Sequence, residues 1–164
     1  MKIVIISDIH DNITNLKKCL SWCRRADIEE LICCGDVTTD ETLDFLAGNF
    51  AGFIRLVKGN AVLFDEEGVG KYGNIKYYGR IGRFELDSRS VGICHEPFLI
   101  DYVLRHGPCD IVFYGHTHEP WIEKRGRMHV VNPGTLGGSF SKATFAVWET
   151  GSGKLELKIL EKLD

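Results

Sequence analysis

Three apolar runs in the first part of the chain end in polar side chains. The run from Lys2 to Ile6 is rich in isoleucine and valine and does not alternate, which is typical of a strand buried on both faces. The runs Leu31–Cys34 and Phe53–Val57 have the same character. The polar residues that follow the three runs are Asp8 and His10, then Asp36, then Asn60.

Between these runs, apolar residues recur every three or four positions, which predicts amphipathic helices. The segment Asp11–Ala26 is the first helix, with Asn12 as its cap, and Thr38 and Glu41 have capping-box spacing at the start of the second. Strands that alternate with helices are typical of a parallel sheet.

The second part of the chain is predicted to be rich in strands. Ile75–Leu86 and Val91–Cys94 are expected to form an antiparallel hairpin that ends at His95, and a short helix over Phe98–Arg105 follows it. The strand Ile111–Tyr114 ends at Gly115-His116-Thr117-His118. The remaining predicted strands are Trp121–Glu123, Met128–Val131, Thr144–Trp148 and Leu155–Leu160. This order predicts an α/β fold of two mixed sheets with helices outside, in one domain of residues 1–164.

Charge and composition exclude several classes of protein. The net charge of −3 argues against the basic face that nucleic-acid-binding proteins usually carry. No apolar run has the length of a signal peptide core or a membrane span. The six cysteines lie in predicted helices and strands, which suits buried thiols in a reducing compartment and predicts a cytoplasmic protein.

The polar residues at the strand ends form a candidate metal-binding set. Each offers an oxygen or an imidazole nitrogen, which suits two hard or borderline divalent ions better than a thiolate site would. In an extended backbone, residues two apart point to the same side, so Asp8 with His10 and His116 with His118 could each converge on an ion. The alternative is a set of strands followed by ordinary polar turns. The candidates are Asp8, His10, Asp36, Asn60, His95, His116 and His118.

In order, Asp-x-His, Gly-Asp, Gly-Asn, a lone His and Gly-His-x-His closely resemble the motifs of the calcineurin-like metallophosphoesterase superfamily over residues 8–118. Asn132-Pro133-Gly134-Thr135 also resembles the Asn-Pro-Gly-Ser block of its small bacterial and archaeal phosphodiesterase-like members. The resemblance implies a four-layer α-β-β-α sandwich with a binuclear metal centre at one edge.

The resemblance also implies roles for the candidate residues. One metal would bind Asp8, His10 and His118, the other would bind Asn60, His95 and His116, and Asp36 would bridge them with its two oxygens. Asp36, Asn60 and His95 would act in catalysis by holding metal and substrate. Two cations would activate a water for attack on phosphorus. We expect manganese first, with iron, zinc, nickel or magnesium as alternatives.

The chain departs from the superfamily at two positions. Most members follow Gly-Asn with a histidine that is thought to stabilise the transition state or protonate the leaving oxygen, and many small members carry Cys and Asp there instead. This chain has Ala61-Val62, which predicts modest activity and a preference for acidic leaving groups. Glu96 replaces a glycine after His95 and could crowd or acidify the rim.

Two functional hypotheses follow. The first is a phosphoesterase, most simply a phosphodiesterase, acting on a small phosphate ester or a nucleotide. The second is a weak or inactive scaffold that binds protein partners, as is thought for the retromer subunit of this fold. A complete ligand set favours the enzyme, and a structural metal site is less favoured because such sites usually use cysteine-rich shells. The oligomeric state is left open.

Overall fold

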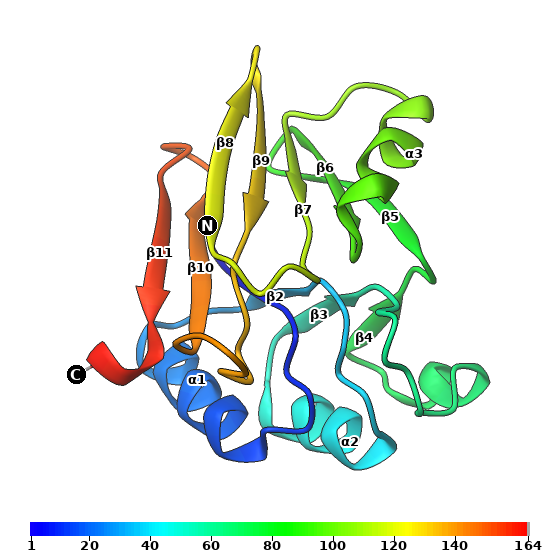
Figure 1. Ribbon diagram of the computed structural model, residues 1–164, viewed down its shortest axis with the longest axis vertical. Helices are drawn as coiled ribbons and strands as arrows, with labels where there is room; N and C mark the ends of the chain where they lie inside the picture. The colour runs from blue at the N-terminus through cyan, green and yellow to red at the C-terminus, as the bar shows by residue number, and fades with distance from the viewer. Residues whose placement is uncertain (164) are drawn as a thin grey trace.

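Two β-sheets pack face to face in the computed structural model, which describes residues 1–163 (Figure 1). The six-stranded sheet has the order β11 (Leu155–Ile159), β10 (Thr144–Glu149), β1 (Lys2–Ile6), β2 (Glu30–Cys33), β3 (Phe53–Leu56) and β4 (Ile75–Tyr77). The five-stranded sheet has the order β5 (Ile81–Leu86), β6 (Arg89–Cys94), β7 (Ile111–Phe113), β9 (Met128–Asn132) and β8 (Trp121–Arg125). Strands β1 to β4 run parallel, as do β6, β7 and β9, and the other pairs are antiparallel.

Helices cover the outer face of each sheet. The α-helices are α1 (Ile13–Arg25), α2 (Asp40–Asn49) and α3 (Ile100–Arg105), and the short 3₁₀ helices are η1 (Glu67–Lys71), η2 (Pro97–Leu99) and η3 (Leu160–Lys162). The Asn12 side chain caps α1 by accepting a hydrogen bond from the Asn15 N–H at 3.0 Å. No helix within residues 1–163 has the length and hydrophobicity needed to cross a membrane.

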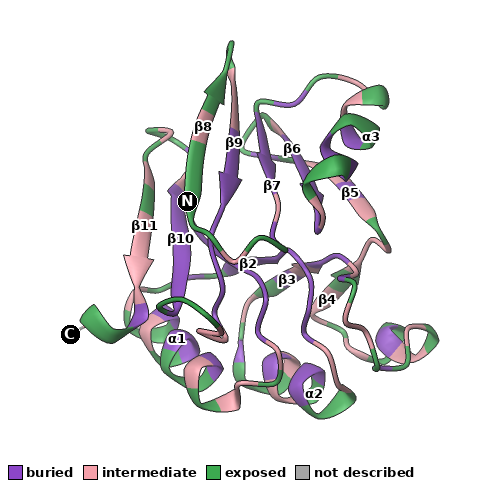
Figure 2. Ribbon diagram, viewed as in Figure 1, coloured by how far each residue is buried: buried purple, intermediate pink, exposed green. Residues whose placement is uncertain are grey.

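The core explains why β1 shows no alternation. Ile3 and Ile5 pack between the two sheets, whereas Val4 and Ile6 pack in the cluster that includes residues of α1 and α2, so both faces of the strand are buried. Strands β7 and β10 also consist mainly of buried residues (Figure 2). A third cluster joins Val103 of α3 to the outer face of the five-stranded sheet. The expected α-β-β-α order is therefore confirmed. All six cysteines are buried free thiols.

Two local predictions are wrong. The segment Ile75–Leu86 is not one arm of a hairpin: β4 pairs with β3 in the first sheet, and only β5 pairs with β6. Gly79, with φ of 66°, lies in the turn that carries the chain from one sheet to the other. The capping box does not form either. Helix α2 begins at Asp40 with Thr39 as its N-cap residue, and the Thr39 hydroxyl donates to Asp11 Oδ1 at 2.7 Å.

Phe113 should be essential for the packing of the sheets. Its side chain is fully buried, and its ring centroid lies 5.7 Å from that of Trp148. We expect Phe113→Ala to lower the free energy of unfolding by about 3–5 kcal/mol, because the change removes buried apolar surface and leaves a cavity. Urea denaturation followed by fluorescence measures this loss. The control is Phe98→Ala, whose side chain is 60% exposed, with an expected change within about 0.5 kcal/mol. Similar losses in both variants would contradict the assignment.

Candidate metal centre

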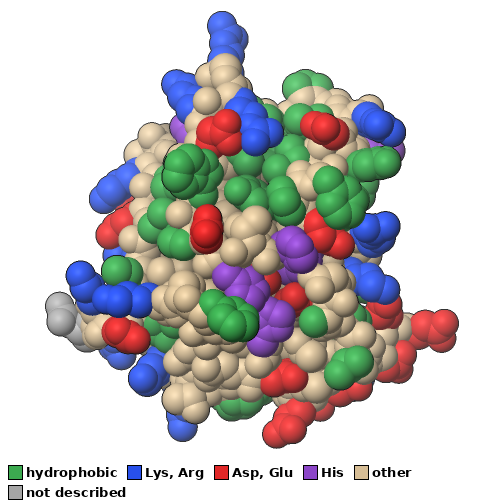
Figure 3. Space-filling view, viewed as in Figure 1, with side chains coloured by type: hydrophobic (Ala, Val, Ile, Leu, Met, Phe, Trp, Pro, Cys, Tyr) green, Lys and Arg blue, Asp and Glu red, His purple; other side chains and the backbone are tan. Residues whose placement is uncertain are grey.

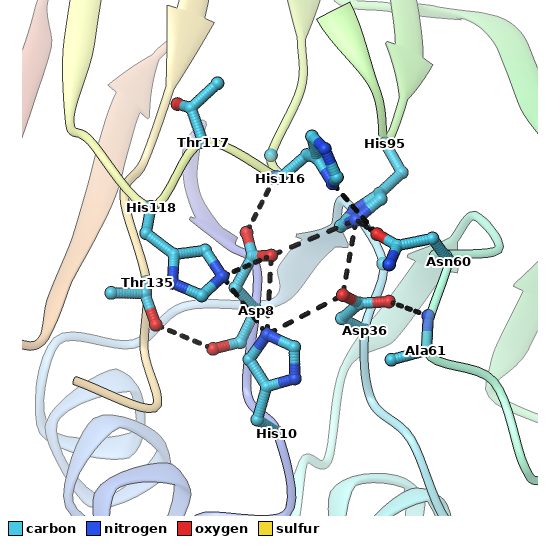
Figure 4. A network of polar contacts seen from close by, with 12 residues as sticks. Asp8, His10, Asp36, Asn60, Ala61, His95, His116, Thr117, His118 and Thr135 are labelled. Atoms are coloured by element: carbon cyan, nitrogen blue, oxygen red, sulfur yellow. Dashed lines mark hydrogen bonds and ion pairs between the residues drawn. The ribbon is translucent and has the colours of Figure 1, made fainter. Parts of the chain in front are cut away.

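The seven candidate ligands meet at one edge of the molecule, where strands from both sheets end (Figure 4). Parallel strands bring their carboxyl ends to the same edge of a sheet. The first sheet contributes the residues after β1, β2 and β3, and the second contributes those after β6 and β7. These residues are Asp8, His10, Asp36 and Asn60 from the first sheet and His95, His116 and His118 from the second.

We predicted that residues two apart converge because the backbone is extended, and this is wrong for both pairs, Asp8 with His10 and His116 with His118. Five of the candidate ligands have positive φ, between 46° and 70°. The side chains therefore converge through left-handed turns instead of through strand alternation. This conformation costs an L-residue roughly 1–2 kcal/mol, and strain of this kind concentrates at functional sites. The five are Asp8, His10, Asp36, His116 and His118.

The Asp8 carboxylate lies at the middle of the cluster and is fully buried. Its Oδ2 accepts a hydrogen bond from the His116 backbone N–H at 3.0 Å. Its Oδ1 has no hydrogen-bond partner among the described residues. Three imidazole Nε2 atoms surround Oδ1, those of His118 at 3.2 Å, His10 at 3.7 Å and His95 at 3.9 Å. A buried carboxylate oxygen without a donor, among ring nitrogens, is an arrangement that a cation completes.

The candidate ligands form two halves, one with Asp8, His10 and His118 and the other with Asn60, His95 and His116. The Asp36 carboxylate lies between these halves. Its Oδ2 is 3.3 Å from His95 Nε2 and 3.6 Å from His10 Nε2. Its Oδ1 accepts a hydrogen bond from the Ala61 N–H at 2.8 Å. The resemblance implies a bridge through both oxygens; in the structure Oδ2 faces both His10 and His95, and Oδ1 is engaged by the Ala61 N–H.

Hydrogen bonding outside the cluster orients the imidazoles. His95 Nδ1 lies 2.7 Å from the Cys34 carbonyl, so Nδ1 carries the proton and donates it. His95 Nε2 lies 2.9 Å from Asn60 Oδ1. Asn60 Oδ1 is also 2.9 Å from His116 Nδ1. In the neutral imidazole a ring nitrogen without its proton and the amide oxygen are both electron-pair donors, so a cation can take the place of the proton in these contacts.

A second close pair lies in the other half of the cluster, where His10 Nε2 and His118 Nε2 are 3.2 Å apart. Two triads hold their ligand atoms within 4.8 Å of one another, Asp8 with His10 and His118, and Asp8 with Asp36 and His95. Asn60 and His116 extend the second triad through the contacts of Asn60 Oδ1. The donor set and its spacing fit two divalent cations.

The carboxylates give the centre a preference for positive charge. Asp8 holds the pKa of His10 above its ordinary value, and Asp36 adds to the effect. Burial alone would lower the pKa of His95, but the neighbouring carboxylates outweigh burial and the pKa is raised. Burial alone would raise the pKa of Asp36, but the contact with His95 outweighs it and the pKa is lowered. Protons and metal ions therefore compete for the same imidazoles.

Several residues hold the ligand-bearing turns in place. The Thr135 hydroxyl donates to the Asp8 carbonyl at 2.9 Å, and Asn132 Nδ2 donates to the Gly115 carbonyl at 3.0 Å. The resemblance included these two residues but gave them no role. Asp11 is a further supporting residue, not among the candidates from the sequence: its Oδ1 accepts hydrogen bonds from the hydroxyls of Thr39 and Thr42. These bonds tie the turn after β1 to the start of α2, and no local sequence signal predicts them.

Glu96 lies beside the centre with its charge partly offset. Its Oε1 is 3.8 Å from Arg80 Nη2, and its side chain is only 14% exposed. The negative charge that Glu96 was expected to add to the rim is therefore partly offset by the neighbouring Arg80 guanidinium.

Gly59 permits a very close approach between the segment that carries Asn60 and the segment that carries Asp36. A Cβ on Gly59 would lie 1.9 Å from Asp36 Oδ1 and 2.3 Å from the Asp36 backbone nitrogen. Any larger residue must therefore displace the Asp36 carboxylate or the strand end that holds Asn60.

We expect Gly59→Ala to weaken the binding of Mn²⁺ by about 10- to 100-fold, the usual range for a change that misplaces a metal ligand without removing it. Calorimetric titration of the metal-free protein with Mn²⁺ measures the affinity. Gly73→Ala is the matched control, because a Cβ at Gly73 meets no atom within 4 Å. Equal affinities in the two variants would show that Asp36 does not depend on this close approach.

The family of the chain follows from comparison with known proteins. The model of the calcineurin-like phosphoesterase superfamily domain matches residues 1–153. The chain therefore belongs to the calcineurin-like phosphoesterase superfamily, which confirms the resemblance seen in the motifs.

Individual relatives agree with this family. Phosphodiesterase MJ0936 of Methanocaldococcus jannaschii is 27% identical over 145 residues, which cover 84% of this chain and 86% of that protein. The structure of a novel archaeal phosphodiesterase matches with a TM-score of 0.86 and 25% identity, over 97% of this chain and 99% of the other. Vps29 of Entamoeba histolytica complexed with Zn²⁺ matches with a TM-score of 0.69 and 19% identity, over 98% and 99%, and shows the shared fold alone. The family and the phosphodiesterase relatives support a metal-dependent hydrolase.

Proposed function

We propose that this protein is a phosphodiesterase with a binuclear metal centre. The observation that carries the proposal is the buried Asp8 Oδ1, which lacks a hydrogen-bond donor and faces three imidazole nitrogens, with Asp36 Oδ2 between His10 and His95. Among phosphoesterases the archaeal relatives named as phosphodiesterases favour diesters as the substrate class. We also propose manganese as the native metal and a cytoplasmic location, the latter from the six buried free thiols.

The residues of the chain divide the work of the centre. Asp8, His10 and His118 would hold one cation, Asn60, His95 and His116 would hold the other, and the Asp36 carboxylate, which faces both His10 and His95, would serve both. When bound, a pair of divalent cations supplies an acidified water and positive charge for the phosphoryl oxygens. Asn60 offers a neutral oxygen and so adds no negative charge that would repel an anionic diester. The Cys34 carbonyl fixes the ring of His95, and the Ala61 N–H fixes Asp36.

The alternative function is a scaffold that binds protein partners, and the structural likeness to Vps29 is the observation that favours it. Against it, all seven ligand positions hold competent side chains, and five of them are kept in a strained backbone. A scaffold gains nothing from this strain, so the enzyme is the better-supported proposal.

The variant Asp36→Asn tests whether the Asp36 carboxylate is needed to hold the two metal ions. We expect wild-type protein with Mn²⁺ to cleave bis(p-nitrophenyl) phosphate faster than p-nitrophenyl phosphate, and the variant to lose at least about 100-fold in kcat, because a neutral amide neither charges nor bridges the centre as a carboxylate does. The control is Asp101→Asn on the exposed surface of α3, which should retain full activity. Two Mn²⁺ ions bound per chain without turnover would favour the scaffold.

Ala61 predicts sensitivity to the leaving group. Its side chain is a methyl group, and its N–H is engaged by Asp36, so this position supplies no proton to the departing oxygen. We expect kcat to fall by about 10²- to 10⁴-fold from p-nitrophenyl to alkyl leaving groups in otherwise identical diesters, the range that a general acid would recover.

The reciprocal variant, Ala61→His, should raise the rate for alkyl esters more than the rate for p-nitrophenyl esters. A series of methyl esters with leaving groups of increasing pKa provides the measurement. Equal rates along the series in the wild-type protein, with chemistry limiting, would show that another group protonates the leaving oxygen.

A further inference from the structure

The turn between β9 and β10 carries an aromatic side chain in an unfavourable state. Phe140 is completely exposed, with a relative exposure of 103%, and its φ is +65°. An exposed phenyl ring loses the free energy that burial would give, and positive φ is a genuine outlier for a bulky residue. Two unfavourable features at one residue point to a functional constraint.

The turn spans residues 133–143, between β9 and β10. Residues on both sides of Phe140 in this turn form hydrogen bonds to segments that carry candidate metal ligands. The Gly137 N–H donates to the Asp8 carbonyl at 2.9 Å, and the Ser141 hydroxyl donates to the His118 carbonyl at 3.3 Å. The Thr135 hydroxyl adds a bond to the Asp8 carbonyl. Phe140 is thus held at the border of the half of the centre formed by Asp8, His10 and His118.

The Phe140 ring does not fill the neighbouring pocket between this turn and α1. The pocket on the α1 side is lined by Asn12, Asn15, Gly138 and Ser141, among others, but not by Phe140. On the face shown in Figure 3, hydrophobic atoms lie directly against the exposed histidine side chains. Phe140 directly precedes Ser141, whose hydroxyl bonds to the His118 carbonyl, so its fully exposed side chain extends into solvent at the border of the histidine cluster.

We propose that Phe140 is a stacking platform for the aromatic base of a nucleotide ester whose phosphate lies at the metal centre. This inference rests on the proposed function and names its substrate class. A flat ring beside a phosphate-binding centre matches a nucleotide, in which a base is joined to the phosphate through one sugar. Because every base has a π-face, a single phenyl ring would bind nucleotides with little preference among the bases.

Binding, measured apart from catalysis, tests the platform. Thymidine 5′-monophosphate and 2-deoxyribose 5-phosphate share sugar and phosphate and differ in the base. With the Mn²⁺-loaded protein, we expect Phe140→Ala to weaken calorimetric binding of the first by about 5- to 100-fold, the range of one base–aromatic stack, and of the second by less than about twofold. Phe140→Tyr should restore binding of the nucleotide.

Phe53→Ala is the matched control, since Phe53 is an exposed aromatic at the opposite, amino-terminal end of β3. If Phe140→Ala weakened the binding of both probes equally, the proposal would be overturned, and Phe140 would instead be needed for the conformation of the turn. Unchanged nucleotide binding would overturn it as well. Base-dependent binding in a protein that hydrolyses neither p-nitrophenyl ester would support the platform while rejecting the proposed catalysis.

Discussion

The buried carboxylate of Asp8 is the group on which the arrangement of the centre depends. It follows β1, which lies inside the six-stranded sheet between β10 and β2, and its Oδ2 accepts the His116 N–H from the turn after β7 of the other sheet. One charged side chain therefore couples the two sheets at the edge where their strands end. Its second oxygen, Oδ1, is left facing imidazole nitrogens without a donor. The same residue thus joins the layers and creates the demand for a cation.

Close packing of the backbone around this carboxylate explains the glycines of the motifs. Gly59 lies against Asp36, and Gly115 lies so close to Ser7 that an added Cβ would be 1.9 Å from the Ser7 hydroxyl oxygen. Side chains at these positions would separate the turns that carry the ligands. The strained φ values of Asp8 and Asp36 follow from the same compression, because their turns bond to each other, as in the hydrogen bond from the Asp8 N–H to the Gly35 carbonyl at 3.1 Å.

Much of this could be predicted from the sequence, because the signals are local. The unalternating run of β1 indicated burial on both faces, and the order of polar residues at strand ends indicated a common edge. Features set by distant contacts could not be predicted. The left-handed turn at Asp8 depends on bonds to the segment after β2, and the N-cap of α2 shifts to Thr39 because Asp11 engages its hydroxyl. The pairing of β4 with β3 has no local signature either, since the pattern of Ile75–Tyr77 fits either sheet.

The energetics of the centre also bear on the choice between enzyme and scaffold. Asp8 and Asp36 are almost fully buried, 0% and 2% exposed, and burying a carboxylate is costly unless it is paired. The raised pKa values of His10 and His95 show that protons can satisfy part of this charge. A divalent ion satisfies more of it, and any ligand that binds only the folded state stabilises that state. A chain freed from catalysis could replace either carboxylate with a neutral side chain and gain stability without a metal. The presence of two buried carboxylates in a strained backbone is therefore best explained by chemistry that needs a metal.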